Sequence, residues 1–156
     1  MYMTDKWEGT EHFIINKFKF IEFYVGNAKQ AVHFYRSTFG FTPYAYCGPE
    51  TGVPSHVSYV LKNNKIFFVF TTPLSSSHPA SNWLKSHGDG VRNIAFDINE
   101  AHSAYKSCIE RGAISNSKPY EHNNEDGFFC EASIKTYGDT IHSFIDTSQY
   151  NGLWAP

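Results

Sequence analysis

The chain has 156 residues, and 13 Lys and Arg against 15 Asp and Glu leave a formal net charge of −2 at pH 7. That balance argues against a protein that binds nucleic acid or an anionic membrane surface, which would carry a basic patch. Apolar residues make up 41% of the chain and aromatic residues 17%, which excludes a disordered protein and favours one compact domain.

The first 17 residues show no clear period, so we expect an arm or a short helix there. They are polar and contain no signal-peptide core, and the longest apolar run, residues 66–70, is far shorter than a membrane-spanning helix. The cysteines, Cys47, Cys108 and Cys130, form no CxxC pair, which argues against a disulfide framework or a zinc site. The expected location is the reducing cytoplasm.

Strand and helix signals follow in chain order. A strand is predicted at 21–25, followed by a helix at 27–35 that Gly40 ends. Three extended runs come next, at 42–47, 56–62 and 65–71. Residues 73–90 read as a linker, with a helix through 80–86.

The same order of signals then repeats. A strand is predicted at 94–98, a helix opens at Asn99 or Glu100 and ends at Gly112, and extended runs follow at 115–120, 128–136 and 140–147. Equivalent positions in the two halves, such as Phe23 and Phe96, lie about 73 residues apart. The sequence therefore predicts two βαβββ modules, at 18–72 and 91–147.

The predicted fold is α+β: the two modules form a shared, open, eight-stranded, barrel-like sheet with the helices outside. Residues 18–150 would form one domain, and 151–156 the start of an inter-domain linker. Alternation along the strands assigns the faces. The residues expected on the helix side are Ile21, Phe23, Val25, Ile94, Phe96 and Ile98. Those expected on the concave side are Phe20, Glu22, Tyr24, Asn93, Ala95, Asp97, His142, Phe144 and Asp146.

Three stretches resemble the N-terminal half of the 4-hydroxyphenylpyruvate dioxygenase family, within the vicinal oxygen chelate (glyoxalase-like) superfamily. They are FYVGNAKQA at 23–31, HGDGVRNIAF at 87–96 and TYGDTIH at 136–142. The resemblance runs from about residue 18 to the last residue. It implies an oxidoreductase of tyrosine catabolism, a non-haem Fe(II) dioxygenase that converts 4-hydroxyphenylpyruvate and O₂ to homogentisate and CO₂. A related enzyme makes 4-hydroxymandelate from the same substrate.

In that family the two-His, one-carboxylate iron site lies in the C-terminal half. The resemblance therefore implies that this chain has no catalytic residues, binds no iron and no other cofactor, and packs against a C-terminal catalytic domain in a homo-oligomer. The positions that match the family's iron-bearing positions are Phe20, Asn93 and Phe144, which we expect to fill the cavity.

Two alternatives stay open. Glu22, Asp97 and His142 could form a displaced metal site on the concave face, since two carboxylates and an imidazole can hold a divalent ion. Alternatively, the chain is a stand-alone binding protein that holds a small ligand in the concavity. The remaining histidines are predicted to be structural or solvated, His56 at the start of a strand and His122 in a polar turn. We expect no histidine to be arranged to activate a cysteine.

Overall fold

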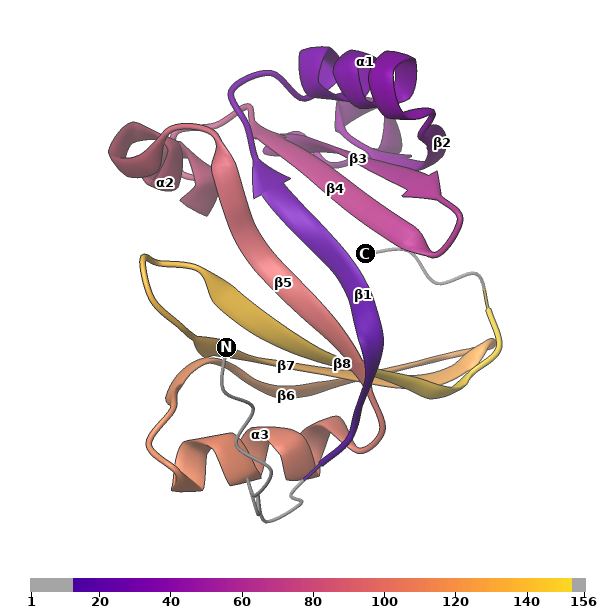
Figure 1. Cartoon of the computed structure of the whole chain (residues 1–156), viewed down its shortest axis with the longest axis vertical. Helices are drawn as coiled ribbons and strands as arrows, with labels where there is room; N and C mark the ends of the chain where they lie inside the picture. The colour runs from indigo at the N-terminus through magenta and orange to yellow at the C-terminus, as the bar shows by residue number, and fades with distance from the viewer. Residues whose placement is uncertain (1–12, 153–156) are drawn as a thin grey trace, which may run out of the picture.

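The computed structural model describes residues 13–152 as one eight-stranded sheet with three α-helices (Figure 1). The elements in chain order are β1 (Ile15–Tyr24), α1 (Ala28–Phe39), β2 (Thr42–Cys47), the single 3₁₀ turn η1 (Pro49–Thr51), β3 (His56–Asn63), β4 (Ile66–Pro73), α2 (Pro79–His87), β5 (Gly90–Ile98), α3 (Ala101–Glu110), β6 (Ile114–Asn124), β7 (Gly127–Lys135) and β8 (Ile141–Tyr150). The predicted pair of βαβββ modules is confirmed, with α2 between them.

The strands follow the order β2-β3-β4-β1-β5-β8-β7-β6. The two first strands, β1 and β5, pair antiparallel at the centre, and each pairs in parallel with the last strand of its own module. Figure 1 shows α1 against β2–β4 and α3 against β6–β8, with β1 and β5 crossing between these two layers. Helices α1 and α3 therefore lie outside one continuous sheet, as the sequence predicts, while α2 packs through Trp83 against Tyr24 at the end of β1.

Local sequence sets the ends of α1. The side chain of Asn27 accepts a hydrogen bond from the Gln30 amide at 3.1 Å, which satisfies one of the free N–H groups of the first turn. Gly40 takes the left-handed conformation (φ 70°), and its N–H bonds back to the carbonyls of Tyr35 and Arg36. This ending turns the chain into β2, so that α1 folds back over its own module.

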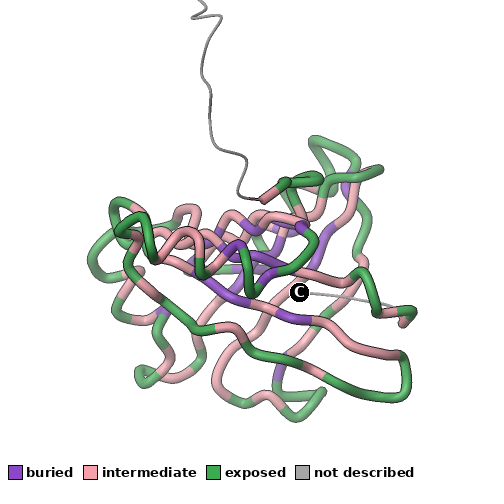
Figure 2. The backbone as a smooth tube through the Cα atoms, turned by 90° about the horizontal axis from the view of Figure 1, so that it is seen from below, coloured by how far each residue is buried: buried purple, intermediate pink, exposed green. Residues whose placement is uncertain are grey.

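The core consists of three clusters, one under each outer helix and one on the concave side. Figure 2 shows the buried stretches running along the strands, while turns and outer helix faces are exposed. The buried residues under α1 are Val25, Ala28, Val32, Phe41, Leu61 and Phe70. Those under α3 are Ile98, Ala101, Ala104, Cys130, Ala132 and Phe144. The concave side buries Phe20, Val60, Val69, Ala95 and Ile145.

The predicted faces are correct for β1 and β5 but wrong for β8. Phe23 and Val25 pack under α1, and Phe96 and Ile98 pack under α3. In the parallel pair of β5 and β8, however, Phe96 lies opposite Phe144, so Phe144 shares its outward face. A shift of one residue moves every side chain of a strand to the other face. His142 and Phe144 therefore point toward α3, and Ser143 and Ile145 face the concavity.

Several strand limits also differ; β5, for example, begins at Gly90 and not at residue 94. β1 begins at Ile15, so residues 15–17 belong to the sheet and not to the predicted arm. β6 continues to Asn124, which places His122 in a strand and not in a solvated turn. The rest of the predicted arm, residues 1–12, and most of the predicted linker, 153–156, lie outside the described residues.

Among residues 13–152, no helix is long and apolar enough to cross a membrane.

Candidate functional site in the concave face

A cavity of about 390 Å³ lies on the concave side of the sheet, between the two modules. Every strand except β8 contributes to its wall. We call it the concave cavity, and its lining residues are Phe20, Glu22, Cys47, His56, Ser58, Val69, Asn93, His122, Phe129 and Glu131. Both modules are needed to close it, because the first supplies Glu22 and the second supplies Glu131.

Glu22 on β1 is the carboxyl group that the sequence places here. The Thr71 hydroxyl donates a hydrogen bond of 2.8 Å to its Oε1, and the Ser58 hydroxyl lies 2.7 Å from that of Thr71. Burial raises the pKa of Glu22, and the nearby charge of Glu131 raises it further, while the Thr71 hydrogen bond and the charge of Arg92 oppose the shift. The cavity thus contains a carboxyl group that resists ionisation.

Glu131 on β7 is a second such group, which the sequence analysis missed. Burial raises its pKa as well. The available signal was its position in the middle of a strand, between the buried residues Cys130 and Ala132. A carboxyl group in the middle of a largely buried strand is unusual, and it marks a position that can be functional.

Asn93 on β5 leaves part of its amide unsatisfied. The residue is 5% exposed, and its Nδ2 donates a 3.0 Å hydrogen bond to the Ser143 hydroxyl. Its Oδ1 is buried and has no partner among the described residues. A buried acceptor without a donor costs about 1–3 kcal/mol, so this wall of the cavity favours a group that donates a hydrogen bond.

Two histidines line the concave cavity: His56, which opens β3 as predicted, and His122, which was expected in a solvated turn. His56 Nε2 lies 3.7 Å from the sulfur of Cys47, and its Nδ1 lies 3.0 Å from the Ser55 hydroxyl. The sequence did not predict this neighbour of Cys47, and whether His56 activates the thiol stays untested. His122 stacks on Phe129, with ring centroids 4.0 Å apart and an interplanar angle of 11°. Cys47 lies near His56 because β2 pairs with β3, and His122 lies on Phe129 because β6 pairs with β7.

The three residues of the hypothetical displaced metal site do not come together. Only Glu22 lines the concave cavity. Asp97 is held by Lys19, whose Nζ lies 2.9 Å from Oδ1, and His142 packs against the ring of Phe96 on the α3 side. Among the described residues, no group of three or more His, Cys, Asp and Glu could hold a metal ion. The strand register of β8 is the physical reason, since it turns His142 outward.

The three positions matched to the family's iron ligands also lie on different sides of the sheet. Phe20 lies on the concave side, 7% exposed and packed in the same cluster as Val69 and Ile145. Asn93 lies beside it in the cavity wall. Phe144 does not fill the cavity as expected, because it packs under α3.

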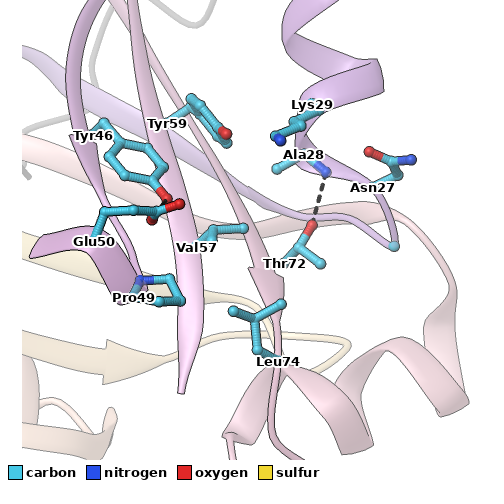
Figure 3. A pocket seen from close by; sticks show the side chains of 11 residues that line it. Asn27, Ala28, Lys29, Tyr46, Pro49, Glu50, Val57, Tyr59, Thr72 and Leu74 are labelled. Carbon is cyan, nitrogen blue, oxygen red and sulfur yellow. Dashed lines mark hydrogen bonds between the residues drawn. The ribbon is translucent and has the colours of Figure 1, made fainter. Parts of the chain in front are cut away.

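A second, more open pocket of about 520 Å³ lies on the other side of the sheet, at the N-terminal end of α1 (Figure 3). Its polar groups mostly satisfy one another. The Tyr46 hydroxyl donates to Glu50 at 2.5 Å, a bond that raises the pKa of Tyr46 to about 12. Thr72 accepts from the Ala28 amide at 2.8 Å and donates to the Val25 carbonyl at 2.7 Å. The concave cavity, with its unmatched groups, is therefore the better candidate site.

Comparison with solved structures places the fold among glyoxalase- and dioxygenase-like proteins. A mutant 4-hydroxymandelate synthase from Streptomyces coelicolor superposes with a TM-score of 0.77 and 25% identity, over 88% of this chain and 40% of that one. Methylmalonyl-CoA epimerase from the same organism superposes with a TM-score of 0.68 and 16% identity, over 85% and 98% of the two chains. The epimerase likeness concerns the fold alone.

The sequence defines the family more closely. Residues 7–153 match the family described as "Hydroxyphenylpyruvate dioxygenase, HPPD, N-terminal", and the chain belongs to it. The 4-hydroxyphenylpyruvate dioxygenase of Danio rerio is 39% identical over 98% of this chain, and that of Dictyostelium discoideum 38% identical over 89%. The chain spans only 39% and 38% of the lengths of these two relatives.

Proposed function

We propose that the chain acts as the N-terminal, non-catalytic half of a 4-hydroxyphenylpyruvate dioxygenase-like Fe(II) enzyme. The whole enzyme would convert 4-hydroxyphenylpyruvate and O₂ to homogentisate and CO₂ in tyrosine catabolism. The observation behind the proposal is the match itself, which extends over 98% of this chain but 39% of its relative from Danio rerio. The iron-bearing half would lie outside the 156 residues.

An iron site of this class needs imidazole and carboxylate ligands on one face of the metal. His56, His122, Glu22 and Glu131 line the concave cavity, but no three such side chains among the described residues could hold a metal ion. The positions matched to the family's ligands do not supply the missing donors. Phe20 offers no donor atom, and the Asn93 amide already bonds Ser143. Phe144 and His142 lie on the other side of the sheet. These placements support a non-catalytic role, and we assign no reaction step to the chain.

An interface role is supported by exposed aromatic side chains on α1. Phe34 and Phe39 are 53% and 56% exposed, and their ring centroids lie 5.9 Å apart. An adjoining groove of about 570 Å³ runs between α1 and the central strands β1 and β5. Apolar surface of this kind is typical of a face that another domain or subunit covers. The proposed partners are the catalytic half of the same protein and further copies of it.

Oxygen uptake tests the non-catalytic role. We expect the purified 156-residue chain, supplied with Fe(II) and 4-hydroxyphenylpyruvate, to consume no oxygen above the protein-free background. The full-length relative from Danio rerio is the positive control in the same assay. Uptake that scales with the concentration of the chain would contradict the proposal.

Sequencing the encoding transcript past the codon for Pro156 tests whether a catalytic half belongs to the same protein. We expect the frame to continue into two further βαβββ modules with two histidines and one carboxylate at module strand positions. A stop codon directly after Pro156 would overturn the proposed half-enzyme. It would leave the alternative of a stand-alone binding protein, which the concave cavity itself favours.

A further inference from the structure

The charged side chains that line the concave cavity are both acidic. Glu22 and Glu131 face it from opposite modules, and neither Lys nor Arg is among its described lining residues. The charge of Glu131 opposes ionisation of Glu22, while that of Arg92, which is not among the lining residues, favours it. A positive charge placed between them would remove that repulsion. The electrostatics of the cavity therefore favour a cation and disfavour an anion.

The neutral groups of the concave cavity indicate which kind of cation it would bind. Asn93 Oδ1 is a buried acceptor without a donor among the described residues. The rings of Phe20 and Phe129 provide apolar and aromatic surface, with His122 stacked on the latter. Aromatic faces attract organic cations as well as apolar groups. Acceptors and aromatic walls together match a molecule with a cationic end and an apolar body.

We propose that the concave cavity binds a small organic amine, whose primary ammonium group is held by Glu22, Glu131 and Asn93 and whose apolar body lies against Phe20 and Phe129. A primary ammonium has three donors and no acceptor, which suits three acceptor side chains. A volume of about 390 Å³ is at the small end of ligand cavities and admits an arylalkylamine. A bare metal ion suits the site less, because no group of three or more His, Cys, Asp and Glu among the described residues could hold one.

Binding of an ammonium group to these two carboxyl groups would be accompanied by the release of protons. Glu22 and Glu131 must ionise to pair with the ammonium, so the complex releases protons and its affinity rises with pH. Other titratable groups face the same space: Cys47 from β2, His56 from β3 and His122 from β6. Arg92 of β5 also acts on Glu22 and favours its ionised form.

Isothermal titration calorimetry on the 156-residue chain tests the proposal with three probes of one shape. Phenethylamine is the cation, 2-phenylethanol the neutral analogue and 3-phenylpropionate the anion. We expect phenethylamine to bind at least about tenfold more tightly than the alcohol, and the anion more weakly than either. Titrations in two buffers of different ionisation enthalpy should show net proton release with the amine alone.

Variants locate the binding in the cavity. We expect Glu131→Gln to weaken phenethylamine by about tenfold and to abolish most of the proton release. Glu110→Gln is the matched control, since Glu110 lies exposed on α3 and pairs only weakly with Lys106 at 3.9 Å. Circular dichroism confirms that both variants fold.

Three results would each overturn the inference: equal affinity for the amine and the alcohol, no phenethylamine binding at millimolar concentration, or equal binding by the Glu131→Gln and control variants. The inference does not rest on iron chemistry. Oxygen uptake by the chain would contradict the proposed function and leave the amine site standing, whereas failed amine binding would leave the proposed function intact.

Discussion

The side chains in the three stretches that relate this chain to its family bond mainly to one another. The Gly26 amide of the first stretch donates to Asp89 of the second at 2.8 Å. His87 of the second lies 2.9 Å from Asp139 of the third, and the Arg92 guanidinium donates to the Asp139 carbonyl. All of these contacts lie near the same ends of β1 and β5. The motif residues thus hold α1, α2 and the turn before β8 in place, which is a structural role.

Asn27, in the first of these stretches, supports a prediction about a single side chain. Asn27→Ala removes the hydrogen bond to the Gln30 amide and should lower the free energy of unfolding by about 1 kcal/mol. Urea unfolding measures the change. His33→Ala, at an exposed position of the same helix, is the control and should stay within about 0.5 kcal/mol of the parent chain. A loss as large in the control would show that the effect of Asn27→Ala does not come from the cap.

At the scale of elements, the register of β8 decides which side chains the concave face receives. Because Ala95 pairs with Ser143 and Phe96 with Phe144, the small and branched residues of β8 face inward and the aromatic residue faces α3. Phe144 then meets the alanines at 101 and 104, whose small side chains let α3 lie close to the sheet. The start of α3 is tied to the same strand, because the Glu100 amide donates a 2.7 Å hydrogen bond to the Asp146 carboxylate of β8.

Phe144→Ala tests this placement. Removing a side chain that is 3% exposed should cost about 3–5 kcal/mol of stability through the cavity left beneath α3. Hydrogen exchange should quicken in α3 and not in α1. Phe34→Ala, at a half-exposed position on α1, should cost about 1 kcal/mol or less. Equal loss of protection in both helices would mean that Phe144 does not belong to the α3 cluster.

At the scale of the whole molecule, the acidic cavity exists only because the two modules share one sheet. Glu22 comes from the central strand β1, and Glu131 comes from β7 in the other module. Burial raises the pKa of both carboxyl groups in the folded chain. The folded state therefore holds these protons more tightly than the unfolded state. Their contribution to stability is fully present below the unfolded pKa and declines as pH rises through the folded pKa.

The double substitution Glu22→Gln with Glu131→Gln should remove that decline. We expect it to stabilise the chain at about pH 8 and to change stability little at about pH 4, where both carboxyl groups are protonated in the folded state. Urea unfolding across this range measures the difference. Glu110→Gln should follow the parent chain at every pH. A difference that does not vary with pH would show that the two carboxyl groups ionise normally in the folded protein.

Repeats and periodicity determined the architecture from sequence alone. Two copies of one βαβββ pattern, each with a glycine shortly after its helix, leave few ways to bury the apolar faces of β1 and β5 other than a shared sheet. Faces within a module also followed from alternation, as Phe23 and Val25 show, because a strand's own sequence sets which side is apolar.

Tertiary structure alone decided the site. The facing of β8 depends on its pairing with β5, and β8 contains polar and apolar residues on both sides, so alternation could not set its register. His122 approaches Phe129, and Cys47 approaches His56, only through strand pairs whose extent the sequence left unclear. Glu22 and Glu131, which line the cavity together, are 109 positions apart in the sequence numbering. Burial of both groups and the charge of Glu131 on Glu22 depend on the folded arrangement.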